Sequence, residues 1–185
     1  MKGAPVRVSP AGLILWSFLF FMLPEREAAA LLVPVAVHEA GHLLSIKLLG
    51  FEIQSISLEL TGLKIEYSRN GSTAAELAVA AAGPLAGIGL WLLCAFVGAE
   101  LMAGVSLLLS IFNLLPIYPL DGGRICRLGL GAIIGSQKGK MIQQRTGDIF
   151  CCTLVGIGFY LLLCGWGAGM FAAGTATLLL SLRED

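Results

Sequence analysis

Six apolar segments occupy most of this 185-residue sequence, and they constrain its fold more than any other feature. They run over residues 9–23, 28–49, 73–97, 101–115, 149–165 and 168–182. A bilayer core takes about 20 helical residues, so the second and third segments are long enough to cross it, while the others are shorter. Hydrophobic residues make up 57% of the chain and charged residues 13%, which is unusual for a soluble domain. We predict an all-α, polytopic membrane protein with about six transmembrane helices.

The positively charged residues predict how these helices are oriented. If the N-terminus is cytoplasmic, 11 of the 12 Lys and Arg residues fall in cytoplasmic segments and only Arg26 falls outside. Cytoplasmic loops of membrane proteins carry an excess of Lys and Arg, so both termini are expected in the cytoplasm. The first apolar segment has an alternative interpretation as a cleaved signal peptide, because Lys2 and Arg7 precede it and small residues follow it.

Charge and cysteine usage argue against a nucleic-acid partner, disulfides and a second metal site. The formal net charge is +0, and no run of Lys or Arg is interleaved with aromatic residues, so we expect no nucleic-acid partner. The 5 cysteines are odd in number and show no Cys-x-x-Cys spacing, which predicts reduced packing residues rather than disulfides or a second metal site.

Both histidines of the chain lie in one motif, His38-Glu39-Ala40-Gly41-His42, within the second apolar segment. Residues four apart on a helix share one face, and this spacing suits two imidazole nitrogens that bind one zinc ion. The glutamate beside the first histidine can then reach a water molecule at the metal. Ionisable groups at membrane depth are usually functional. The motif therefore predicts a metallohydrolase site, with His38 and His42 as ligands and Glu39 as general acid and base.

A catalytic zinc ion with two histidine ligands needs a third protein ligand, and here only a carboxylate can supply it. Asp121 is the candidate, because it approaches from the cytoplasmic side within a stretch whose prolines and glycines prevent a regular helix. Its alternative is a solvated turn aspartate. Asn113, the only asparagine in an apolar segment, is a candidate for holding the substrate backbone or stabilising the oxyanion. Its alternative is an interhelical hydrogen bond.

Residues 51–68 alternate between apolar and polar side chains around Thr61-Gly62, which predicts a β-hairpin with a two-residue turn on the cytoplasmic side. The hairpin is either a connector on the membrane surface or an edge strand that binds an extended substrate segment. Residues 116–147 are predicted to be a loop. Within it, residues 124–147 show no strong pattern, and their five positive charges favour a position on the anionic inner leaflet.

Three motifs in this order resemble the site-2 protease family of intramembrane zinc metalloproteases. They are His-Glu-x-x-His in a membrane helix, Ala82-Gly83-Pro84, and Asn-Leu-Leu-Pro-Ile-Tyr-Pro-Leu-Asp-Gly-Gly-Arg over residues 113–124. The resemblance covers residues 28–127, the family's three-helix catalytic core, within a single domain of residues 1–185 that has peripheral helices at 9–23 and 149–182. It implies that His38, His42 and Asp121 hold one Zn²⁺ per chain and that Glu39 is catalytic.

The resemblance also implies a function, an intramembrane endopeptidase that cleaves in or near a membrane-associated segment of a protein substrate. The third motif is most similar to the sporulation branch, which matures a pro-sigma factor, so pro-sigma and anti-sigma factors are candidate substrates. The lipid bilayer and regulatory membrane proteins are further candidate partners, and the implied location is the bacterial cell membrane. Two features depart from the family: Gly87 stands where many relatives have asparagine, and the chain ends at Asp185 without the branch's nucleotide-sensing domain. Gly83 and Gly87 form a small-xxx-small pair that allows close helix packing.

Two other functions are compatible with a pair of histidines in a membrane helix. A zinc transporter is disfavoured, because such carriers usually show internal repeats and several ligands along a path, whereas this chain has one histidine motif and no visible repeat. A catalytically silent zinc-binding scaffold is disfavoured by Glu39 and by the coordination position that three protein ligands leave open.

Overall fold

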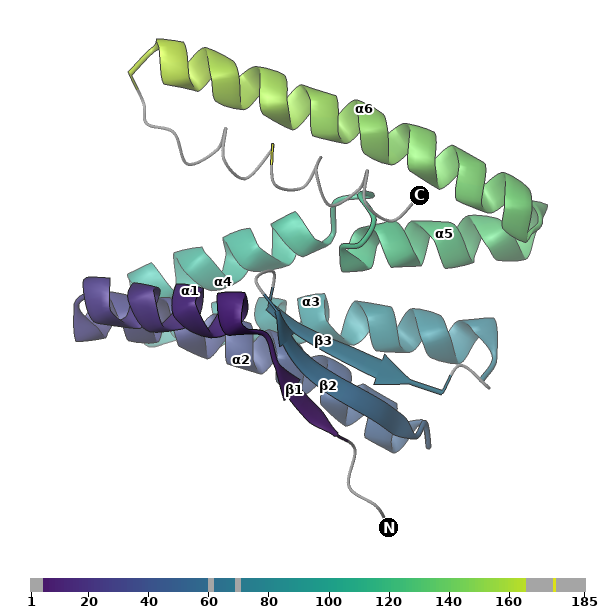
Figure 1. The fold of residues 1–185 in the computed structure, drawn as a ribbon, viewed down its shortest axis with the longest axis horizontal. Coiled ribbons are helices and arrows are strands. Elements are labelled where there is room, and N and C mark those ends of the chain that lie inside the picture. Colours follow the sequence, from purple (N-terminus) through teal and green to yellow (C-terminus); the bar gives the residue numbers. More distant parts are fainter. Residues whose placement is uncertain (1–4, 60–61, 69–70, 166–174, 176–185) are drawn as a thin grey trace. The chain divides into compact units, whose positions relative to one another are not determined.

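The computed structural model describes residues 5–59, 62–68, 71–165 and 175, and the chain divides into two compact units. The first unit, residues 1–111, contains most of the elements, and the second unit, residues 112–185, begins within the last turn of α4. The elements of the first unit are β1 (Val6–Val8), α1 (Pro10–Met22), α2 (Glu25–Leu48), β2 (Ile53–Glu59), β3 (Gly62–Tyr67), α3 (Thr73–Phe96) and α4 (Glu100–Asn113) (Figure 1). The second unit contains α5 (Asp121–Ile134) and α6 (Ser136–Leu163).

The helices confirm the predicted class, a mostly helical membrane protein with a small sheet. Within the described residues, α2, α3 and α6 are long and apolar enough to cross a membrane, and α4 is a shorter apolar helix. α1 has 13 residues and coincides with the first apolar segment. The sixth apolar segment, residues 168–182, lies outside the described part of the chain apart from residue 175.

The three strands form one sheet in the order β1-β2-β3, with β1 parallel to β2 and β3 antiparallel to it. The predicted hairpin is therefore present, with Ile56 opposite Ile65. Its turn was predicted one residue too late, because Gly62 already pairs with Glu59 in the ladder. Residues 60–61 connect the strands and lie outside the described ranges. The sequence did not predict β1, which is only 3 residues long.

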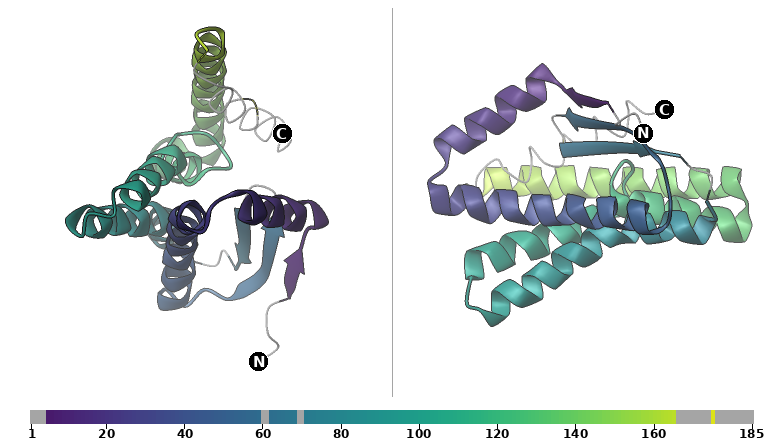
Figure 2. Two further views of the ribbon diagram at one scale, coloured as in Figure 1. Left: turned by 90° about the vertical axis from the view of Figure 1, so that its left-hand side faces the viewer. Right: turned by 90° about the horizontal axis from the view of Figure 1, so that it is seen from below.

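The sheet packs on α2 and α3 through a small apolar cluster. Ile46 of α2, Tyr67 of β3 and Val79 of α3 form its buried centre, and Phe51, Ile53 and Ile65 pack against it. Figure 2 shows the strands alongside the C-terminal half of α2, which also carries the histidine motif. The sheet thus lies next to the helix segment that bears the candidate metal ligands.

α2 and α3 approach each other closely along a face with regular spacing. The buried residues of α2 include a series four apart, Ala30, Pro34, His38, His42 and Ile46, so both histidines lie on the packed face. A Cβ atom at Gly41 would come within 2.6 Å of the Ala82 carbonyl oxygen, which shows how little space separates the two backbones.

α3 contacts α4 through glycine and serine. Ser106 donates a hydrogen bond to the Gly87 carbonyl oxygen at 2.8 Å, and Ser110 donates to the Ser106 carbonyl oxygen at 2.8 Å. A Cβ atom at Gly87 would overlap the Ser110 hydroxyl. Gly87 therefore serves close packing against α4, and this agrees with the small-residue spacing in the sequence.

The second unit differs from the sequence prediction. Residues 116–147 were predicted as a loop, but most of them form α5 and the polar first half of α6. The two helices form a hairpin that turns at Gly135, whose φ is 91° (Figure 1). A Cβ atom at Gly139 of α6 would lie 2.6 Å from the Gly131 backbone nitrogen of α5, so the helices touch at their backbones. The apolar residues of α5 do share one helical face, but its four glycines and the polar residues early in α6 give the segment a low helix propensity, and the prediction of a loop followed from that composition.

Candidate metal centre

α2 places the two histidines one helical turn apart with their Nε2 atoms facing each other. The Nε2–Nε2 distance is 3.2 Å, and the rings meet edge to face at 80° with centroids 4.9 Å apart. Two nitrogens bound to one tetrahedral zinc ion at about 2.0–2.1 Å would themselves lie about 3.3 Å apart. The spacing of the two nitrogens therefore fits a shared zinc ion without rearrangement of α2.

The backbone of α3 determines which nitrogen of His42 is available to a metal. His42 Nδ1 lies 2.8 Å from the Val79 carbonyl oxygen, and a carbonyl only accepts hydrogen bonds, so Nδ1 carries the proton. In the neutral ring the lone pair is then on Nε2, which faces His38. Metal-binding histidines commonly donate their other ring N–H to a backbone carbonyl in this way.

Asp121 is the first residue of α5, and its position depends on the two glycines that follow it. A Cβ atom at Gly122 would overlap the Leu114 carbonyl oxygen, and one at Gly123 would lie 2.5 Å from the backbone of Ile117 and Tyr118. Any side chain at either position would push the backbone of residues 114–118 away from α5. The Asp-Gly-Gly sequence therefore allows residues 114–118 to pack directly on the first turn of α5.

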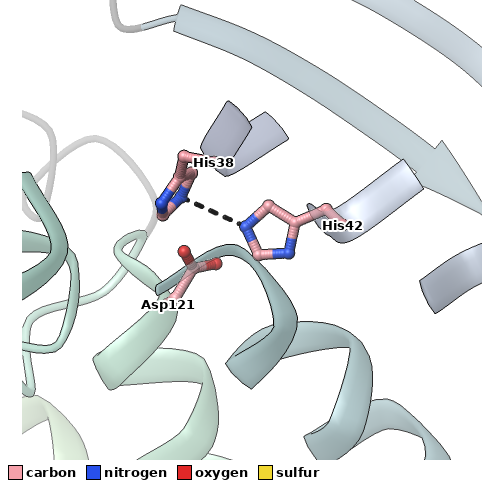
Figure 3. A group of neighbouring side chains, drawn as sticks. All are labelled: His38, His42 and Asp121. Carbon is pink, nitrogen blue, oxygen red and sulfur yellow. Dashed lines mark hydrogen bonds between the residues drawn. The ribbon is translucent and has the colours of Figure 1, made fainter. Parts of the chain in front are cut away.

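His38, His42 and Asp121 together form a group that could hold a metal ion. One ligand atom from each residue lies within 4.8 Å of the others (Figure 3). The three residues are 4%, 8% and 8% exposed. A carboxylate this deeply buried is normally paired or bound to a metal, because its desolvation is otherwise costly. The donor set of two imidazoles and one carboxylate is an established zinc set that leaves one coordination position open.

Sequence reasoning missed two residues of α6 that contact the segment before Asp121. Gln143 of α6 is 1% exposed, and its Nε2 donates to the Pro116 carbonyl oxygen at 3.4 Å. Gly147, one turn further along α6, would bring a Cβ atom within 3.3 Å of the same oxygen. α6 thus packs on the loop that leads to Asp121. Gln143 lies in the segment without an apolar pattern, so only its polar character inside a helix could have drawn attention to it.

The two predicted catalytic residues outside the ligand group are half-buried. Glu39 lies in α2 directly after His38, and Asn113 is the last residue of α4. Their catalytic roles remain predictions. All five cysteines lie in the described part of the chain and are free thiols, of which Cys94 and Cys151 are buried and Cys152 and Cys164 are exposed.

The sequence is similar to a peptidase family and to several named proteins. Residues 99–157 match peptidase family M50. The chain is 32% identical to stage IV sporulation protein FB of Bacillus subtilis over 140 residues, which are 70% of this chain and 49% of that protein. It is 34% identical to a zinc metalloprotease of Methanocaldococcus jannaschii over 149 residues, which are 72% of this chain and 40% of that protein. The chain spans less than half the length of the curated relatives it matches.

The fold has a counterpart among solved structures. The site-2 protease from Methanocaldococcus jannaschii superposes with a TM-score of 0.71 and 24% sequence identity, covering 100% of this chain and 92% of that chain. This similarity establishes the fold of the chain.

Proposed function

We propose that this chain is an intramembrane zinc metalloendopeptidase of the site-2 protease family, because residues 99–157 match peptidase family M50 and the relatives include a zinc metalloprotease. One observation supports this function above others: two buried imidazoles and a buried carboxylate have ligand atoms within 4.8 Å of one another. In this proposal His38, His42 and Asp121 hold one Zn²⁺ per chain. A zinc ion held there would act as a Lewis acid that activates water and polarises the scissile carbonyl.

The remaining chemistry belongs to the side chains of the protein. Glu39 accepts the proton from the attacking water and returns it to the leaving amine. Its place next to His38 in α2 supports this role, because the same helix that holds two ligands also holds the base. Asn113 holds the substrate backbone or donates a hydrogen bond to the developing oxyanion.

The substrate is a protein whose cleaved bond lies in or near a membrane-associated segment. A helical substrate hides its peptide bonds in backbone hydrogen bonds, so cleavage requires a locally unwound segment with helix-weakening residues. Similarity to a sporulation protein supports pro-sigma and anti-sigma factors as candidates. The lipid bilayer and regulatory membrane proteins complete the proposed partners.

The proposed setting is a multi-pass protein of the bacterial cell membrane with both termini in the cytoplasm. The distribution of Lys and Arg supports this orientation, because 11 of 12 then lie on the cytoplasmic side. We further propose that the catalytic core is residues 28–127, with the other helices at its periphery, in one protease domain.

Replacement of Glu39 by Gln tests the proposal. Purified wild type and Glu39→Gln are compared for cleavage of a single-span test substrate and for zinc content. We expect the variant to keep its zinc and to lose cleavage by about 10²–10⁴-fold, the usual contribution of a general acid–base residue. If both proteins bind zinc and neither cleaves any substrate tested, the site belongs to a carrier or a scaffold and the protease proposal fails.

A further inference from the structure

Beside the two histidines, α3 contributes a residue that has no side chain. Gly83 is buried and lies one helical turn after Val79, the residue whose carbonyl oxygen accepts the His42 Nδ1 hydrogen bond. A Cβ atom at Gly83 would overlap His42 Nε2 and would lie 2.6 Å from Cε1 and 2.7 Å from Cδ2 of the same ring. α3 therefore adjoins His42 at both ring nitrogens: the Val79 carbonyl oxygen accepts a hydrogen bond from Nδ1, and Nε2 occupies the space that a side chain at Gly83 would fill.

The ring of His42 has no easy way to avoid a side chain at this position. It is 8% exposed and lies on the face of α2 that packs against α3. Rotation away from Gly83 would break the 2.8 Å hydrogen bond to Val79 and would turn Nε2 away from His38. The backbones are also close, since Ala82 lies against Gly41, so α3 cannot retreat without disturbing the helix pair.

We propose that Gly83 is a positioning residue for the metal centre: the missing side chain provides the space in which His42 Nε2 points at the ion. This inference rests on the proposed zinc site and deepens it, because it assigns the orientation of one ligand to a residue that does not touch the metal. The role differs from that of Gly87, whose nearest neighbour is the Ser110 hydroxyl of α4. The two glycines of the Gly-x-x-x-Gly pair therefore serve different helices.

Zinc affinity tests the inference, with a matched control on the same helix. In Gly83→Ala we expect the zinc affinity, measured by competition with a chelator, to fall by about 10–100-fold, the usual effect of removing support from a metal ligand. Gly89→Ala is the control, because a Cβ atom at Gly89 meets nothing within 4 Å, and it should bind zinc like the wild type. Cobalt substitution should show an altered visible spectrum for Gly83→Ala alone. Equal zinc affinity in the two variants would overturn the inference.

A double-mutant cycle separates positioning of His42 from simple helix packing, and it does not require zinc. The melting temperature of the metal-free protein is measured for wild type, Gly83→Ala, His42→Ala and the double variant. If Gly83 makes room for the ring, Gly83→Ala lowers the melting temperature in the wild-type background and has little effect once the ring is absent. The same loss in both backgrounds would show that Gly83 only packs α3 and would overturn the inference.

The two proposals can fail separately in these experiments. If wild-type protein binds no zinc, the proposed function fails, and the melting-temperature cycle still decides whether Gly83 positions His42. If wild-type protein binds zinc and Gly83→Ala binds it equally well, only the positioning role is overturned.

Discussion

At the scale of single residues, the metal centre depends on small distances between backbone and side chain. His42 is held at Nδ1 by the Val79 carbonyl oxygen, and Gly122 and Gly123 allow the backbone before Asp121 to pack on α5. The sequence predicted His38 and His42 because their four-residue spacing alone implies a shared face. The role of Gly83 could not be predicted, because a glycine in a helix does not reveal which neighbouring side chain occupies its space.

Asn113 provides a test at this scale, because its two interpretations predict different results. If it stabilises the oxyanion, Asn113→Ala should lower turnover by about 10²–10³-fold while zinc content and melting temperature stay close to those of the wild type. Turnover on a test substrate, zinc content and thermal unfolding are measured on the same preparation. A lower melting temperature with normal turnover would instead identify Asn113 as an interhelical hydrogen-bonding residue.

At the scale of elements, hydropathy located the helices well and the short or polar elements poorly. α2 and α3 fall within a few residues of the apolar segments because a run of about 20 apolar residues has few alternatives to a helix. β1 is too short to show a pattern, and its partner β2 lies about 50 residues away. The first half of α6 is polar and is helical because it packs against α5 and the loop before Asp121, which no local pattern reveals.

The hairpin can be tested as a substrate-binding element by proline substitution in β3. Neighbouring residues of a strand direct their N–H groups to opposite sides, so of Ile65→Pro and Glu66→Pro one removes a backbone hydrogen bond to β2 and the other removes a backbone donor from the outer edge. Glu66→Pro also removes the side-chain hydrogen bond that Ser55 Oγ of β2 donates to Glu66 Oε2 at 2.7 Å. The outer-edge variant should raise KM several-fold, since each lost hydrogen bond is worth about 0.5–1.5 kcal/mol. Its zinc content should not change.

The control for this experiment is the other variant of the pair. The variant that loses its backbone hydrogen bond to β2 disturbs the hairpin itself, so it should lower the melting temperature in addition to raising KM. If both variants cleave a test substrate with wild-type KM, the hairpin is only a connector on the membrane surface.

At the scale of the whole molecule, the distribution of charge predicts the orientation in the membrane. With a cytoplasmic N-terminus, the turn after α3, at Gly98, lies outside the cell, and the segment around Gly71 lies inside. Single epitope tags at both termini, at Gly71 and at Gly98 of the full chain test this arrangement in spheroplasts. Only the tag at Gly98 should bind antibody before the membrane is permeabilised. Antibody binding at either terminus of intact spheroplasts would contradict the proposed orientation.

Val79 belongs both to the apolar cluster under the sheet and to the surroundings of the candidate metal centre. Its side chain lies in the cluster with Ile46 and Tyr67 that joins the sheet to the helices, and its carbonyl oxygen holds the ring of His42. If a ligand on β3 shifts this residue and thereby changes the affinity of the centre for zinc, zinc must change the affinity for that ligand by the same factor. Binding of zinc and binding of a substrate to β3 would then be thermodynamically linked through Val79. If each raises the affinity for the other, a substrate would bind more tightly to the zinc-loaded enzyme than to the metal-free chain.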